Sequence, residues 1–152
     1  MLRSGAQMPS LEGATRWLNG GEATLESLRG GPVLVQFWAL SCGICKDQLP
    51  ALQRLKERYG PRGLRVVSVH MPRQESDTRV EAVEDIVRAN GMDEPVAIDN
   101  AHAIGGRFET EGLWPMYFLF DAEGRLRSRT AGAAGLSVLE SALRRVIDGA
   151  AA

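Results

Sequence analysis

Two cysteines carry the most evident chemistry in this chain of 152 residues. Cys42 and Cys45 are its only cysteines, and two residues separate them. Such a pair can clamp a metal, form a structural bridge, or open and close as a redox couple. The count excludes a four-sulfur zinc site, and the histidines, His70 and His102, lie far along the chain. A Cys-x-x-Cys loop is too short to constrain much of the unfolded chain, so the redox couple is favoured.

The composition is that of an ordinary globular protein. Apolar residues make up 44% of the chain and charged residues 24%, with a net charge of −1. These values give no indication of a nucleic-acid partner or an anionic membrane surface. No apolar run approaches the roughly 20 residues that span a bilayer, and the first residues lack the apolar stretch of a secretory signal. We expect one domain, residues 1–152, that is cytoplasmic as written, or periplasmic or otherwise extracytoplasmic if a leader or membrane module has been removed.

The cysteines lie between a predicted strand and a predicted helix. Residues 33–38 are a nearly unbroken apolar run, which predicts a central strand covered on both faces. From Cys45 onward apolar residues recur every three or four positions, which predicts a helix over about 43–59, kinked at Pro50. The N–H groups and the dipole at a helix start stabilise an anion, so the pKa of the Cys42 thiol is expected to be lowered. The sequence therefore predicts an exposed nucleophile and, one turn deeper on the same face, a sheltered second thiol.

The rest of the chain alternates between predicted strands and helices. Further strands are expected over 64–70, 95–99, 116–120 and 125–130, the last two forming a hairpin. Further helices are expected from about 78 to 91, over 101–108, and from about 137 to 147. Parallel βαβ units followed by an antiparallel hairpin and a helix predict an α/β fold with a mixed sheet flanked by helices on both faces.

Several side chains outside the cysteine motif have predicted structural roles. Thr78 with Glu81, and Ser137 with Glu140, have the spacing of capping boxes at helix starts. Three arginines that alternate along the last strand are expected to be a solvated guard on an exposed sheet edge: Arg125, Arg127 and Arg129.

Around the cysteines the sequence resembles the thioredoxin superfamily, and more closely its TlpA and ResA-like thiol-disulfide oxidoreductases with an AhpC/TSA-redoxin-type domain. The resemblance rests on Phe37-Trp38-Ala39 before the cysteines, Pro50 after them, and Trp114-Pro115 before residues 116–120. It covers nearly the whole chain. It implies a thioredoxin fold with a strand-helix insertion, at about 71–113, before the cis-proline.

The resemblance also implies roles for individual residues. Cys42 would attack, Cys45 would resolve, and the dithiol would exchange with protein substrates through a mixed disulfide. Pro115 would be cis, and the backbone of Trp114 would dock an extended substrate segment. Supporting positions would be Trp38, Gly43, Ile44, Gln36 and Gln48. A monomer that needs no cofactor or metal, and that exchanges electrons with a donor or acceptor protein, follows from the same resemblance.

Several positions depart from the family pattern, among them Ile44, where the dipeptide between the cysteines is Gly-Ile rather than Gly-Pro. Ser41 stands where an aromatic residue often precedes the first cysteine. Gln36 and Gln48 replace, respectively, the buried acid of thioredoxins and the glutamate of ResA-like proteins. Both are amides, so no base is assigned to Cys45, although a buried Gln36 should hydrogen-bond to its neighbours. His70 is expected to be a hydrogen-bonded structural residue, with a base or ligand role as the alternative, and His102 to be solvated.

Three other functions remain open at this point. A peroxiredoxin-like peroxidase would carry Thr three residues before its nucleophile, where this chain has Ala39. A copper metallochaperone on the same fold would use the thiols with His70, but that group usually spaces its cysteines by three residues. A thioredoxin-like interaction module with incidental thiols is the third. Thiol-disulfide exchange is favoured over all of them.

Overall fold

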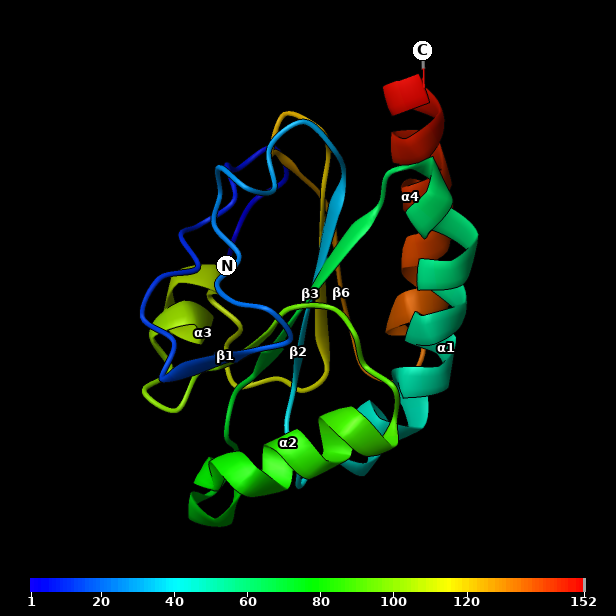
Figure 1. The fold of residues 1–152 in the computed structure, drawn as a ribbon. Coiled ribbons are helices and arrows are strands. Elements are labelled where there is room, and N and C mark those ends of the chain that lie inside the picture. The colour runs from blue at the N-terminus through cyan, green and yellow to red at the C-terminus, as the bar shows by residue number, and fades with distance from the viewer. Residues whose placement is uncertain (152) are drawn as a thin grey trace.

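A six-stranded sheet with helices on both faces forms the centre of the computed structural model, which describes residues 1–151 (Figure 1). The strands are β1 (Arg16–Leu18), β2 (Val33–Trp38), β3 (Arg65–His70), β4 (Val96–Ile98), β5 (Met116–Phe120) and β6 (Leu126–Ala131). The helices are α1 (Gly43–Tyr59), α2 (Val80–Ala89), α3 (Ala103–Phe108) and α4 (Gly135–Ala151), with short 3₁₀ turns at Gly60–Arg62 and Glu75–Thr78. Within residues 1–151, no helix has the length and apolar content needed to cross a lipid bilayer.

The sheet is mixed, as the sequence predicted. Its order is β1-β4-β3-β2-β5-β6, with β2, β3 and β4 parallel and the other pairings antiparallel. The unbroken apolar run of β2 therefore lies in the interior of the sheet, and its six residues are all buried. Strand β1 was not predicted, because three partly exposed residues at a sheet edge show no alternating pattern.

The two faces of the sheet carry different helices. In Figure 1, α1 and α4 lie side by side against one face, and α3 and the amino-terminal segment lie on the other. Along β2 the side chains alternate between these layers. Phe37 packs edge-on against Phe108 of α3, while Leu34 and Trp38 face α1. The first half of α1 and helix α2 share a hydrophobic cluster that contains both cysteines.

Both predicted capping boxes are wrong. The Thr78 hydroxyl donates to the carbonyl oxygen of Glu75 at 2.7 Å, inside the 3₁₀ turn that precedes α2. Helix α4 begins at Gly135, two residues earlier than expected, and the Ser137 hydroxyl donates back to the carbonyl oxygen of Ala134 at 3.0 Å. In both cases the hydroxyl bonds a local carbonyl instead of a free helix N–H, a competition that is common for Ser and Thr.

Strand β6 is an edge strand, as expected, but its arginines are not a simple solvated row. Arg127 forms an ion pair with Asp121 at 3.2 Å, and Arg129, whose side chain is mostly buried, pairs with Glu111 at 3.4 Å. Residues 5–8 cover the start of the edge through backbone hydrogen bonds to the segment around Arg125. The amino-terminal segment therefore covers part of this sheet edge and protects it from pairing with another chain.

Candidate active site

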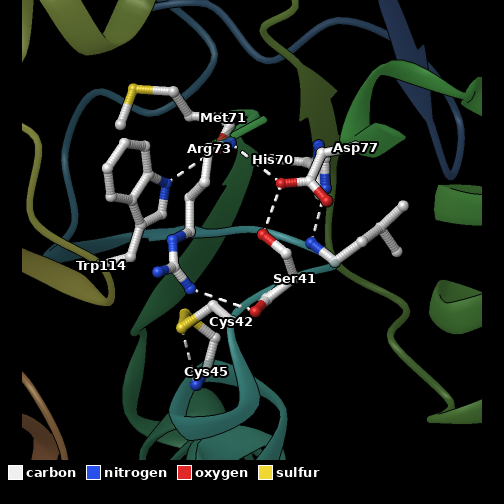
Figure 2. The surroundings of a disulfide bond; sticks show 9 residues. Ser41, Cys42, Cys45, His70, Met71, Arg73, Asp77 and Trp114 are labelled. Carbon is white, nitrogen blue, oxygen red and sulfur yellow. Dashed lines mark hydrogen bonds between the residues drawn. A yellow bond between two sulfur atoms is a disulfide. The ribbon is translucent and has the colours of Figure 1, made fainter. Parts of the chain in front are cut away.

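The two cysteines form a disulfide at the beginning of α1. Cys42 is the N-cap residue of the helix, and its sulfur accepts a hydrogen bond from the backbone N–H of Cys45 at 3.1 Å (Figure 2). Their Cα atoms lie 5.2 Å apart, which is the ordinary separation for a bridged pair. The pair follows β2 by way of a three-residue loop that begins at Ala39. The interior strand thus fixes where the helix starts, and the helix start fixes where the sulfurs lie.

Both sulfurs are more sheltered than the sequence suggested. Cys42 is only 3% exposed and Cys45 only 1%. The expected exposed nucleophile is therefore wrong for the disulfide form, because the bridge folds Cys42 into the cluster that contains Trp38 and Leu49. The neighbouring surface includes an apolar side chain: Ile44, between the cysteines, is among the few large hydrophobic residues that are exposed.

The Trp114–Pro115 segment lies beside the disulfide end of β2. Pro115 immediately precedes β5, whose first residue, Met116, is paired with Phe37 of β2. The peptide bond between Trp114 and Pro115 is cis. The Trp114 indole is half-buried, and its Nε1 donates to the carbonyl oxygen of Met71 at 2.8 Å (Figure 2). These contacts bring the predicted docking residues and the cysteines to the same end of the sheet.

His70, at the end of β3, is a structural histidine, as the sequence favoured. It is fully buried, its ring packs edge-on against Trp38, and its Nε2 accepts the backbone N–H of Leu40 at 3.0 Å. Burial lowers the pKa of His70 from 6.5 to about 4, against the opposing effect of the Asp77 charge. The ring is therefore neutral at pH 7 with its acceptor nitrogen in use, which leaves it poorly suited as a base for Cys45. His102 is exposed but not fully solvated, because its Nε2 lies 2.8 Å from the carbonyl oxygen of Pro72.

The free energy of unfolding should fall by up to about 3 kcal/mol as the pH drops from 6.5 to 4, because of His70 alone. In this window the unfolded histidine binds a proton that the folded one, with a pKa of about 4, does not. Urea unfolding of the protein and of a His70→Gln variant between pH 4 and 7.5 isolates this contribution from that of the carboxylates. The difference in stability between the two proteins should shrink as the pH falls, whereas parallel curves would contradict a neutral buried ring.

Gln36 belongs to a buried chain of hydrogen bonds. Its side-chain amide donates to Ser68 at 2.7 Å, and the Ser68 hydroxyl donates to the carboxylate of Glu94 at 2.5 Å. The ammonium of Lys56, on α1, closes the chain by donating to the same carboxylate at 2.7 Å. On the same face of β2, Leu34 packs against the second half of α1 and Trp38 against the first half. Gln36, which lies between them on that face, is therefore beneath the helix. Its amide is hydrogen-bonded, as expected.

The buried carboxylate near the position of the thioredoxin acid thus comes from Glu94, just before β4. Sequence reasoning did not find it, because Glu94 lies in a loop beside another acidic residue, and no pattern marks one of the two as buried. Gln48 is not part of this chain. It is half-buried and faces a groove between α1 and α4 that Leu136 and Glu140 also line.

A second polar cluster borders the disulfide, and it was also missed. Asp77 is only 2% exposed, and one of its oxygens accepts both the Ser41 hydroxyl at 2.7 Å and the backbone N–H of Arg73 at 2.9 Å. The Arg73 guanidinium donates to the carbonyl oxygen of Ser41 at 3.1 Å and lies over the Trp114 ring, 5.9 Å from its centroid (Figure 2). Arg73 and Asp77 follow the carboxyl end of β3, beside that of β2, and this position is the signal that could have found them.

Comparisons with known proteins agree with this geometry. Residues 4–129 match the family model described as the AhpC/TSA family. Over 141 residues the chain is 38% identical to the thiol-disulfide oxidoreductase YkuV of Bacillus subtilis, covering 92% of this chain and 93% of that protein. It is 28% identical over 129 residues to the thiol-disulfide oxidoreductase ResA of Bacillus thuringiensis, covering 85% and 71%.

A solved structure gives the same result. The solution structure of a thioredoxin-like protein in the oxidized form is 37% identical and superposes with a TM-score of 0.85, covering 95% of this chain and 97% of the other. Neither a peroxidase nor a copper chaperone is better supported than thiol-disulfide exchange. From its sequence, its fold and its Cys42–Cys45 disulfide, the chain belongs to the AhpC/TSA family and is a thiol-disulfide oxidoreductase of the TlpA and ResA-like branch of the thioredoxin superfamily.

Proposed function

We propose that Cys42 is the attacking cysteine and Cys45 the resolving one. The observation that carries this assignment is the hydrogen bond from the Cys45 N–H to the Cys42 sulfur at the start of α1. In the reduced protein the same N–H and the helix dipole stabilise a thiolate at Cys42 more than at Cys45. Cys45, one turn further into the helix and bonded to Cys42, would react with Cys42 rather than with an external substrate.

In the reducing direction the exchange has two steps. The Cys42 thiolate attacks one sulfur of a substrate disulfide, so that a bond forms between Cys42 and the substrate and the second substrate sulfur leaves as a thiolate. The Cys45 thiolate then attacks the Cys42 sulfur, which forms the internal disulfide and releases the first substrate sulfur. Two electrons pass from the cysteine pair to the substrate, and a donor protein returns them. The oxidising direction is the same sequence in reverse, with an acceptor protein.

The residues around the disulfide also suggest where a substrate docks. The backbone at Trp114 and Pro115 would bind an extended substrate segment, with exposed Ile44 and Leu113 supplying apolar contact on either side. Trp38 would pack beneath the disulfide in the cluster that holds both cysteines, and Gly43 would leave the surface next to Cys42 open, since a Cβ there would meet no atom within 4 Å beyond its own chain neighbours and helix backbone. We propose a monomer formed by one domain, cytoplasmic or, if exported, extracytoplasmic, that has a protein redox partner.

Pulse alkylation tests the assigned order. In the reduced protein, a short pulse of iodoacetamide at pH 7 should modify Cys42 at least about tenfold faster than Cys45, because the thiolate is the reactive form. Peptide mapping by mass spectrometry measures both rates, and the protein unfolded in urea, in which the two should react alike, is the control. Faster or equal modification of Cys45 in the folded protein would reverse or remove the assignment.

A further inference from the structure

The Arg73 guanidinium has more hydrogen-bonding capacity than the protein uses. Arginine carries five N–H donors, and the one side-chain hydrogen bond of Arg73 runs to the carbonyl oxygen of Ser41. Among residues 1–151, no carboxylate lies within the 4.0 Å that defines an ion pair with it. Arg73 is exposed. Most of its donors are therefore free to bind a ligand.

The guanidinium is nonetheless held in place. Asp77 fixes the Arg73 backbone and the Ser41 side chain through the same oxygen, so the loop after β3 is tied to the residue that precedes Cys42. The Trp114 ring supports the guanidinium from one side, and Trp114 is itself anchored to the carbonyl oxygen of Met71. In Figure 2 the Arg73 guanidinium lies between the Trp114 ring and Cys42. A cation positioned in advance loses little freedom when a ligand binds.

The buried Asp77 carboxylate does not pair with this cation. One Asp77 oxygen accepts the Ser41 hydroxyl and the Arg73 backbone N–H, and the ion pairs among the described residues include none between Asp77 and the Arg73 guanidinium. The guanidinium, which donates to the residue that precedes Cys42, therefore keeps donors for a charged group on a substrate segment that approaches Cys42. A planar guanidinium beside an aromatic ring matches a carboxylate, which it can bind through two parallel hydrogen bonds.

We propose that Arg73 is a specificity-determining residue for disulfide exchange, and that it binds a carboxylate carried by the substrate segment one or two residues from the reacting cysteine. The preferred substrates are then proteins whose exchanging cysteine is flanked by Asp or Glu. This inference rests on the proposed docking of the substrate at Trp114 and Pro115. It assigns to Arg73 a contact with the substrate and no part in the bond-making steps.

Matched peptides test the proposal. Three disulfide-bonded peptides would be identical except for Glu, Gln or Lys at the two positions that flank the reacting cysteine. For the unaltered protein, kcat/KM should be about tenfold higher for the Glu peptide than for the Lys peptide, mainly through KM, and the ratio should fall as salt is added. In Arg73→Gln the ratio should approach one, in Arg73→Lys it should be partly retained, and in Arg73→Glu it should invert.

Arg79→Gln is the matched control. Arg79 is an exposed arginine of the same connection, has no ion pair among the described residues, and precedes α2 rather than bordering the disulfide. This variant should retain the full preference. The Gln peptide separates this inference from the proposed function, because every variant should still exchange with it if Cys42 is the attacking residue. A preference that survives in Arg73→Gln, an equal slowing of all three peptides, or no preference in the unaltered protein would each overturn the assignment of Arg73.

Discussion

Replacing Glu94 by Ala should lower the free energy of unfolding by about 3 kcal/mol. The carboxylate side chain is only 4% exposed and accepts hydrogen bonds from Lys56 and Ser68. Without it, the buried Ser68 hydroxyl has no acceptor, and the Lys56 ammonium keeps only its exposed partner, Asp93. The unsatisfied Ser68 hydroxyl and the loss of the sheltered partner of Lys56 account for most of the cost.

The neighbouring residue provides a matched control. Asp93 also forms an ion pair with the Lys56 ammonium, but its carboxylate is 79% exposed. Asp93→Ala should therefore cost less than about 1 kcal/mol, as exposed pairs do. Urea unfolding of both variants at pH 7 measures the difference. Equal losses for Asp93→Ala and Glu94→Ala would show that the buried chain contributes no more than a surface ion pair.

The second large effect is the complete loss of turnover when either cysteine is changed. Cys42→Ser should be inactive because no thiolate attacks the substrate, whereas Cys45→Ser should complete the first step and then stop at the mixed disulfide. Reduction of a disulfide-bonded protein substrate, followed under steady-state conditions, should be lost in both variants. A burst of one released substrate thiol per protein molecule should appear with Cys45→Ser only. Turnover retained by Cys42→Ser would exclude the mechanism.

Much of the fold could be predicted from the sequence, because the elements that carry the site are also the most regular. Strand β2 is buried on both faces and therefore appears as an apolar run, and α1 buries one stripe and therefore shows a helical period. The helix starts at Thr78 and Ser137 were wrong because a hydroxyl near a helix start can bond locally instead of capping. Strand β1 is too short to give any pattern.

Some residues of the site could be predicted from the sequence and others could not. The cysteines, Trp114 and Pro115 are recognisable because they form short contiguous motifs next to predicted elements. Asp77 acquires its role through a contact with Ser41, 36 positions away in the chain. Glu94 likewise acts through Ser68, 26 positions away in the chain, which is paired with Gln36 of β2. Polar residues in loops and short turns show no periodic pattern, so only the folded chain shows which of them are in contact.

Trapping of the mixed disulfide tests the central claim most directly. Reduced Cys45→Ser protein would be mixed with a disulfide-bonded substrate protein at pH 7, quenched with acid, and digested for mass spectrometry without reduction. If Cys42 attacks and Cys45 resolves, a single covalent adduct should form in which the substrate cysteine is bonded to Cys42. Cys42→Ser protein treated in the same way should yield no adduct. Adducts of equal yield in the two variants, with the substrate bonded to Cys45 in the second, would contradict the assignment of Cys42 as the attacking cysteine.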